Sequence, residues 1–151
     1  MELSNEIKKY IDQSVLCWLA TVSKDGVPNV SPKEIFTSYE NKIIVANIAS
    51  PTTVMNIKRN PDVCIAFIDI LLQKGFQLKG TAQIITKKHL DFSKMELALV
   101  KLTHGLFPFS SITEIKITSD KPIIAPRYLL FPETTEEEQI ESAKRVYGLI
   151  S

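Results

Sequence analysis

The chain has 151 residues, of which 44% are hydrophobic and 23% are charged, and its net charge is +1. This length and balance fit one domain over 1–151 with ordinary soluble composition, and the scattered lysines predict no nucleic-acid or membrane-surface partner. The chain has no run of about 18 apolar residues, and its polar, charged start does not resemble a signal peptide, so we expect a cytoplasmic protein without a membrane segment.

In chain order, helical spacing and strand-like runs follow each other closely. The expected elements are a helix at 3–14, strands at 15–22, 27–37 and 42–46, a helix within 47–61, strands at 63–68 and 76–86, a helix at 86–102, a strand at 112–118, an extended segment at 120–132 and a helix at 135–148. The short connections predict a mainly β fold with peripheral helices, a six-stranded antiparallel barrel. A parallel sheet would need longer crossovers.

Two strands carry signs of irregular pairing. Pro28 and Pro32 interrupt the strand at 27–37, so it should lie at a sheet edge or carry a bulge. Gly80 interrupts the alternating strand at 76–86, which predicts a bulge or the close approach of a ligand or another backbone. Trp18 lies in the first strand and is expected to belong to the core.

Residues 47–61, NIASPTTVMNIKRNP, have the pattern of a strand end, a tight loop and a short helix. Ser50 stands at the expected N-cap, Pro51 at the first helical position, and Thr52 and Thr53 follow. Unpaired amides and hydroxyls at the positive end of a helix dipole are suited to a phosphate. A capped surface helix without any ligand would explain the same residues.

The remaining reactive side chains predict no further site. Cys17 and Cys64 lie in apolar strand-like runs and are expected to be buried thiols in a reducing compartment. His89 and His104 lack a partner at ligand spacing, so no metal site is expected. No Ser-His-Asp or Cys-His arrangement can be assembled from the spacing, so the catalytic residues stay unassigned.

The order of three segments resembles that of a known family. LATVSKDGVPNVSPK, SPTTVMNIKRNPDVCIAF and FQLKGTAQII follow each other within residues 11–118 in a way that is similar to the pyridoxamine 5′-phosphate oxidase-like, FMN-binding split-barrel family. The resemblance implies a split barrel and a homodimer with FMN in grooves between the subunits. It also implies that the phosphate of FMN lies at the start of the helix in 47–61.

The family often places a basic residue beside a serine or threonine at this helix start, whereas Thr52 and Thr53 stand here. The negative charge of the phosphate would then need Lys33 or Lys79, although strand lysines usually face solvent. Ser31 and Asn47 resemble positions facing the flavin ring and ribityl chain. The cofactor-binding residues that the resemblance implies are Ser31, Lys33, Asn47, Ser50, Thr52, Thr53, Asn56 and Lys79. Lys58 and Arg59 are expected to form a solvated face.

The C-terminal part departs from the oxidase proper, which binds its substrate's phosphate with an arginine- and proline-containing segment. Here Arg127 and Tyr128 do not reproduce that pattern, so the resemblance implies a relative with another substrate. Three functions stay open: an FMN-dependent oxidoreductase or flavin reductase for a small molecule with NAD(P)H as a donor, a flavin-binding module for electron transfer or storage, and a split barrel with a deazaflavin, haem or no ligand. Trp18, Phe107 and Phe109 are candidates to flank a flavin ring; the core is the preferred place for Trp18, and the two loop phenylalanines could equally fill the dimer interface.

Overall fold

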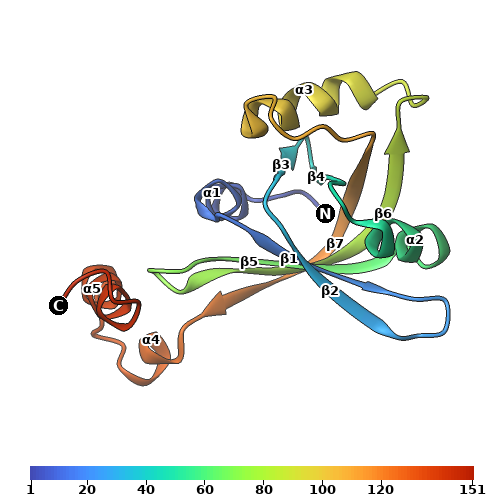
Figure 1. Ribbon diagram of the computed structural model, residues 1–151. Coiled ribbons are helices and arrows are strands. Elements are labelled where there is room, and N and C mark those ends of the chain that lie inside the picture. Colours follow the sequence, from blue (N-terminus) through green and yellow to red (C-terminus); the bar gives the residue numbers. More distant parts are fainter.

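Apolar strands joined by short connections form one curled antiparallel sheet with helices around it (Figure 1). The computed structural model describes residues 1–151, and the strand order is β2-β1-β5-β6-β7-β4-β3. The strands are β1 (Cys17–Val22), β2 (Pro28–Lys33), β3 (Phe36–Tyr39), β4 (Lys42–Ala46), β5 (Asp62–Asp69), β6 (Lys74–Thr86) and β7 (Ser111–Ile124). The helices are α1 (Asn5–Gln13), α2 (Pro51–Arg59), α3 (Phe92–Thr103), α4 (Pro126–Leu130) and α5 (Glu136–Val146). The expected fold, antiparallel β with peripheral helices, is confirmed.

The sheet has seven strands rather than six, because the strand expected at 27–37 is divided in two. β2 pairs only with β1 and β3 pairs only with β4, so the two halves lie at opposite edges of the sheet. The edge position of β2 was predicted from its prolines, which cannot donate a ladder hydrogen bond. The chain leaves β2 after Lys33, so this side chain stands at the end of an edge strand.

The backbone of β7 passes closely over Gly80 of β6. The close approach of another backbone was one of the arrangements predicted for this glycine. A Cβ added at Gly80 would overlap the carbonyl oxygen of Lys116, and the register between the two strands shifts at Lys79/Gly80. The approaching group is therefore a neighbouring strand. Gly80 is needed here because no side chain fits between the two backbones.

Two expected boundaries were wrong. Residues 87–91 form turns ahead of α3, which begins only at Phe92. The segment expected to be extended at 120–132 is extended as far as Ile124, where β7 ends, and then forms the short helix α4. Pro122 is compatible with the strand because β7 pairs there with β6 alone and its other side is a free edge. Figure 1 shows α4 and α5 at the far end of this extension, away from α2.

Two hydrophobic clusters lie against the sheet. The larger holds 19 buried residues from α1, α2 and strands β1 and β3 to β7, and the smaller lies under α3. Trp18 belongs to neither and is 48% exposed, so the expectation of a core tryptophan was wrong. The reason is the alternation of β1: Cys17 and Leu19 take the inner face, and Trp18 points to the outer one. No helix is both long and apolar enough to cross a bilayer.

Candidate anion site at the start of α2

The helix α2 begins where the sequence predicts, but the side chain of its N-cap residue, Ser50, does not cap it. Val54 donates the first helical hydrogen bond to the carbonyl of Ser50, at 3.1 Å. The Ser50 hydroxyl instead donates to the carbonyl of Ile48 at 2.9 Å and makes no capping hydrogen bond. The amides of Thr52 and Thr53 belong to the first turn and so have no helical partner. The positive end of the helix dipole is therefore available to an anion.

Lys33 supplies a cation directly beneath this helix start. Its ammonium donates to the hydroxyls of Ser50 at 2.6 Å and Thr53 at 3.2 Å, and the residue is only 7% exposed. None of the ion pairs in the structure involves Lys33. Burial lowers the pKa of this ammonium, and the nearby Cys17 thiol acts in the opposite direction. A buried cation without a carboxylate is costly, and an anion at the same place would offset that cost.

Two more of the predicted residues complete the cluster. Ser31 lies two positions before Lys33 on β2, and its hydroxyl is 3.3 Å from that of Thr53. Thr53 is buried between them, whereas Thr52 is exposed at the surface of the same helical turn. The structure thus brings four predicted residues into direct contact around one point, namely Ser31, Lys33, Ser50 and Thr53.

The side chain of Asn47, predicted to face the flavin, is hydrogen-bonded to β7 in this chain. Its amide oxygen accepts from the Thr113 hydroxyl at 2.8 Å, and its amide nitrogen donates to the Ser111 hydroxyl at 3.1 Å. The backbone N–H of Asn47 also donates to the carbonyl of Ser111 at 3.1 Å. Two residues later, Ala49 has a φ of 48°, a left-handed conformation that is costly for alanine. Asn47 therefore fixes the strained loop that presents Ser50.

The last two predicted residues lie outside the cluster. Asn56 is buried and donates to the hydroxyl of Thr21 at 3.0 Å, which ties α2 to β1. Lys79 is exposed and pairs across the sheet with Cys64 on the outer face. Lys33 shares the inner face with Cys17, its direct partner across the β1–β2 ladder. The two candidate cations thus lie on opposite faces, and within this chain only Lys33 reaches the start of α2.

Two hollows adjoin the cluster. One, of about 220 Å³, is lined by Lys33 and by mostly apolar side chains that include Ile48 and the half-exposed Phe107. The other, of about 540 Å³, follows the flank of α2 from Ser50 to its basic end. Its lining residues are Asn47, Ser50, Pro51, Val54, Met55, Lys58, Arg59 and Ser111. Sequence reasoning did not assign Ser111 and Thr113, since no local signal pairs β7 with Asn47.

The C-terminal residues Arg127 and Tyr128 do not join this cluster within the chain. The Tyr128 hydroxyl donates to the carbonyl of Leu72 at 3.0 Å, and the ammonium of Lys74 lies 4.4 Å from its ring centroid. These contacts hold α4 on the β5–β6 hairpin of the same chain. Figure 1 places that hairpin at the opposite end of the sheet from α2.

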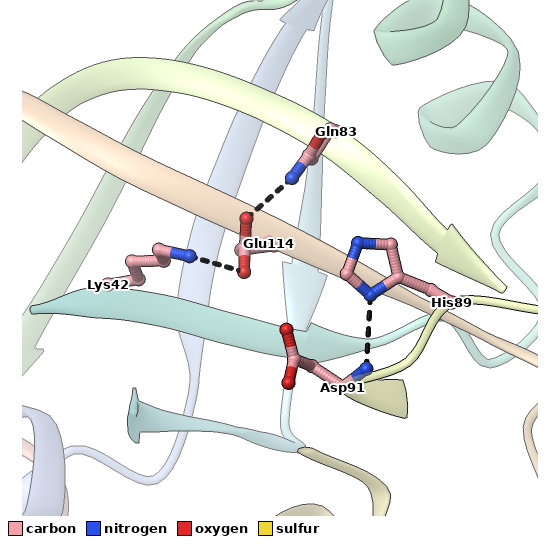
Figure 2. Close-up of polar contacts among 5 residues, drawn as sticks. All are labelled: Lys42, Gln83, His89, Asp91 and Glu114. Carbon is pink, nitrogen blue, oxygen red and sulfur yellow. Dashed lines mark hydrogen bonds and ion pairs between the residues drawn. The ribbon is translucent and has the colours of Figure 1, made fainter. Parts of the chain in front are cut away.

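A second buried charge, Glu114 on β7, differs from Lys33 in being fully paired. Figure 2 shows its carboxylate between Lys42 and Gln83, at distances of 2.8 Å and 2.7 Å. His89 and Asp91 lie nearby in the turn before α3, where the Asp91 amide donates to the imidazole of His89. Lys42, Gln83 and Glu114 border a polar hollow of about 730 Å³. Because each oxygen of Glu114 already has a donor, the group connects β4, β6 and β7 and needs no external cation.

The outer face of the sheet carries an apolar hollow of about 520 Å³. Its lining residues, all hydrophobic, are Val15, Leu16, Trp18, Ala66, Phe67, Ile68, Ile70 and Ile123. Val30 on β2 is also exposed on this face, directly opposite Ala20 in the β1–β2 ladder. Cys64 lies here too and is only partly buried, so the expectation of two buried thiols holds for Cys17 alone.

The segment that contains these elements matches a known family model. The model described as pyridoxamine 5′-phosphate oxidase covers residues 3–100, which is more than half of the chain. The chain belongs to the pyridoxamine 5′-phosphate oxidase-like family. The predicted family is therefore confirmed, and with it the split-barrel fold.

Other proteins are similar over part or most of the chain. An uncharacterized protein of Methanocaldococcus jannaschii is 29% identical over 86 residues, 55% of this chain and 56% of its own length. The chain thus spans about half the length of this curated relative. HupZ of Group A Streptococcus is 25% identical, with a TM-score of 0.69, over 82% of this chain and 95% of that one.

Two further structures share the fold at lower identity. An FMN-binding protein of Syntrophomonas wolfei is 16% identical with a TM-score of 0.67, over 78% of this chain and 83% of that one. HutZ, the haem storage protein of Vibrio cholerae, is 19% identical with a TM-score of 0.65, over 82% and 95% of the two chains. The fold is thus shared by proteins described with different ligands.

Proposed function

We propose that this protein is an FMN-binding oxidoreductase that holds the cofactor's phosphate at the start of α2. The observation that carries the proposal is the buried ammonium of Lys33, which has two hydroxyl partners and no carboxylate. A phosphate there would pair with this cation and accept hydrogen bonds from the hydroxyl of Thr52 and the first-turn amides of α2. The residues present therefore fit the phosphate of FMN.

Bound FMN would supply hydride or electron transfer to or from a small molecule, with NAD(P)H as a possible donor. The chain's own groups would bind and orient the cofactor. Lys33 and Thr53 would hold the phosphate, and the hollow beside Lys33 would accept part of the ring against Phe107.

A second candidate is a flavin-binding module without a substrate of its own. It is favoured by the composition of the cluster, in which the contacting groups are hydroxyls and one ammonium and no carboxylate or imidazole takes part. The haem storage protein that shares the fold favours a third candidate, haem as ligand. The three differ in what the purified protein absorbs and in whether a reduced nicotinamide bleaches it.

The test compares FMN with riboflavin, which lacks the phosphate. We expect the purified protein to show flavin absorption bands or to take up added FMN, and to bind FMN far more tightly than riboflavin. Equal affinity for the two would refute the phosphate site, and binding of haem without flavin would refute the proposal altogether. Anaerobic mixing with NADH or NADPH then separates the first two candidates, because a flavin that stays oxidised excludes a reductase that uses these donors.

We further propose that a second copy of the chain covers the outer sheet face. This arrangement would bring Lys79 of one subunit to the start of α2 in the other. The apolar hollow at Trp18 supports this, because large exposed apolar patches mark interaction surfaces. Trp18→Glu should convert a dimer to a monomer in light scattering, whereas Leu97→Glu on the exposed side of α3 should not. A wild-type monomer would refute this assembly.

A further inference from the structure

The short helix α4 leaves an apolar surface uncovered in its own chain. None of its residues is buried, and Leu129, Leu130 and the following Phe131 are 68%, 72% and 64% exposed. Tyr128 attaches the helix to the β5–β6 hairpin through the carbonyl of Leu72. Three large apolar side chains in a row on the surface mark a contact with another molecule more often than a solvated end.

The residues that follow α4 are acidic. Between positions 131 and 141 the chain has five glutamates and no lysine or arginine. Three of these glutamates have partners within the chain, two in ion pairs and one in the capping box of α5. The other two, Glu133 and Glu137, are exposed and take part in no ion pair. The segment therefore presents an apolar surface first and unpaired negative charge after it.

The hollow of about 540 Å³ on the flank of α2 has the complementary order. Pro51, Val54 and Met55 form its apolar part, and Met55 is 46% exposed. Lys58 and Arg59 line its far end, where both are exposed and neither takes part in an ion pair. An apolar strip that ends in two cations matches an apolar helix that leads into two carboxylates.

The two surfaces cannot meet within one chain, because α4 and α2 lie at opposite ends of the sheet (Figure 1). A second copy can bring them together. In the proposed dimer, Lys79 of one subunit lies at the start of α2 in the other. Lys79 and Lys74 are five positions apart on β6, about 17 Å at about 3.4 Å per residue, and the ammonium of Lys74 lies over the ring of Tyr128 in α4. The nine residues of α2 span about 14 Å.

We propose that α4 and the acidic start of α5 of one copy occupy the flank of α2 in a second copy. The exposed leucines of α4 lie on the apolar strip, and the two unpaired glutamates lie beside the basic end. The inference rests on the proposed dimer of the flavin-binding protein and gives it a specific contact. Because the hollow begins at Ser50, which contacts Lys33, the segment from the second copy also closes the open flank of the phosphate site.

Charge reversal tests the contact, with the dissociation constant of the dimer measured by analytical ultracentrifugation. Lys58→Glu/Arg59→Glu and Glu133→Lys/Glu137→Lys should each weaken the dimer at least about tenfold, because each places like charges opposite one another. The two reversals combined should restore the dissociation constant to within about threefold of the wild type. The wild-type dimer should also weaken as salt is added, since the pairs are at the surface.

The matched control is Lys87→Glu/Lys88→Glu, which reverses two exposed lysines in the turn before α3. It should leave the dimer intact and should not rescue Glu133→Lys/Glu137→Lys. Thermal melts establish that each variant is folded. A combined variant that dimerises no better than its parents would overturn the inference, as would reversals that leave the dimer unchanged. In both cases the wild-type dimer and FMN titration would leave the proposed assembly and phosphate site standing, whereas a wild-type monomer would end the inference and the assembly together.

Discussion

Replacing Lys33 by methionine should separate binding from stability. Methionine has an unbranched side chain of similar length, so it fills the same space without the charge. The two hydroxyls that lose the ammonium keep other contacts: Ser50 still donates to the carbonyl of Ile48, and Thr53 still lies beside Ser31. The substitution therefore leaves no buried hydroxyl stranded. It removes a buried cation that has no carboxylate partner.

The two effects should have opposite signs. Losing a hydrogen bond between a charged group and the phosphate costs about 1.5–3 kcal/mol, which is about a ten- to a hundredfold loss of FMN affinity. The flavin-free variant should be equally stable or more stable than the wild type, because a buried charge is replaced by an apolar group. Each kcal/mol gained raises the Tm of a chain of this size by about 2–4 °C.

Fluorescence titration with FMN and with riboflavin, together with thermal melts of the flavin-free proteins, measures both effects. We expect FMN affinity of Lys33→Met to approach that of riboflavin, while riboflavin affinity stays unchanged. Lys94→Met is the comparison, because it removes an exposed lysine from α3. Unchanged FMN affinity in Lys33→Met would refute the reasoning, and so would an equal loss for riboflavin.

The same lysine predicts a pH dependence. Burial lowers the pKa of Lys33 in the folded chain below its ordinary value of 10.5. The unfolded chain therefore holds this proton up to higher pH, and the destabilisation by Lys33 is lost as pH rises from the lowered pKa toward 10.5. Over the same window the phosphate loses its cation, so FMN affinity should fall in the wild type and stay flat in Lys33→Met. A rise of wild-type affinity with pH would contradict this.

Three further predictions concern the framework around the site. Asn47→Ala should lower the free energy of unfolding in urea by about 1–3 kcal/mol, because the buried Thr113 hydroxyl loses its acceptor. Adding Thr113→Val should recover part of this loss, and no recovery would argue against a stabilising role of the Asn47–Thr113 hydrogen bond. Gly80→Ala should lower the Tm by an amount equivalent to about 1–3 kcal/mol or more, since its Cβ meets the Lys116 carbonyl, whereas Gly26→Ala has free space and should act only through its positive φ. Burial raises the pKa of Cys17 to about 12, so a thiol reagent should leave Cys17 unmodified in the native protein at pH 8, and its modification before unfolding would contradict its burial.

The local part of the site could be predicted from the sequence, because helix starts carry local signals. Serine followed by proline and two threonines indicated α2, and the structure has the helix from Pro51 to Arg59. The long-range partners could not be predicted in this way. Ser50 is a good N-cap residue by type, yet its hydroxyl contacts Lys33 at the end of β2. Only the register of β1 with β2 places Lys33 on the inner face.

The same limit explains the error over Trp18 and the unpredicted contacts of Asn47. The first strand is apolar on both faces, so its alternation cannot tell which side chains are buried. Cys17 and Leu19 take the core, and Trp18 is left on the outer face. That Asn47 faces a flavin stays a prediction, and the structure adds that both ends of its amide are hydrogen-bonded to β7. That pairing joins residues more than 60 positions apart, and no local pattern encodes it.

The two buried charges of the chain show why the start of α2 is the stronger candidate for a ligand. Glu114 is 5% exposed and Lys33 is 7% exposed, so desolvation acts on both. Lys42 and Gln83 each donate to one oxygen of the Glu114 carboxylate, so both of its oxygens have a partner within the chain. Lys33 has hydroxyl partners alone, and hydroxyls leave its charge uncompensated. The unpaired ammonium of Lys33 lies beside first-turn amides of α2 that have no helical partner. An anion bound at this point would interact with both.

The charge of Lys33 also addresses the departure of this chain from its family at the helix start. Thr52 and Thr53 stand where the resemblance led us to expect a cation, so α2 itself offers a phosphate only amides and hydroxyls. The edge strand β2 delivers a lysine to the same point from below, through direct contact with Thr53. If β2 supplies the cation, a basic residue restored on the helix should replace it. Thr52→Lys in the Lys33→Met background should recover FMN affinity, and failure to recover would show that the position of Lys33, and not charge alone, holds the phosphate.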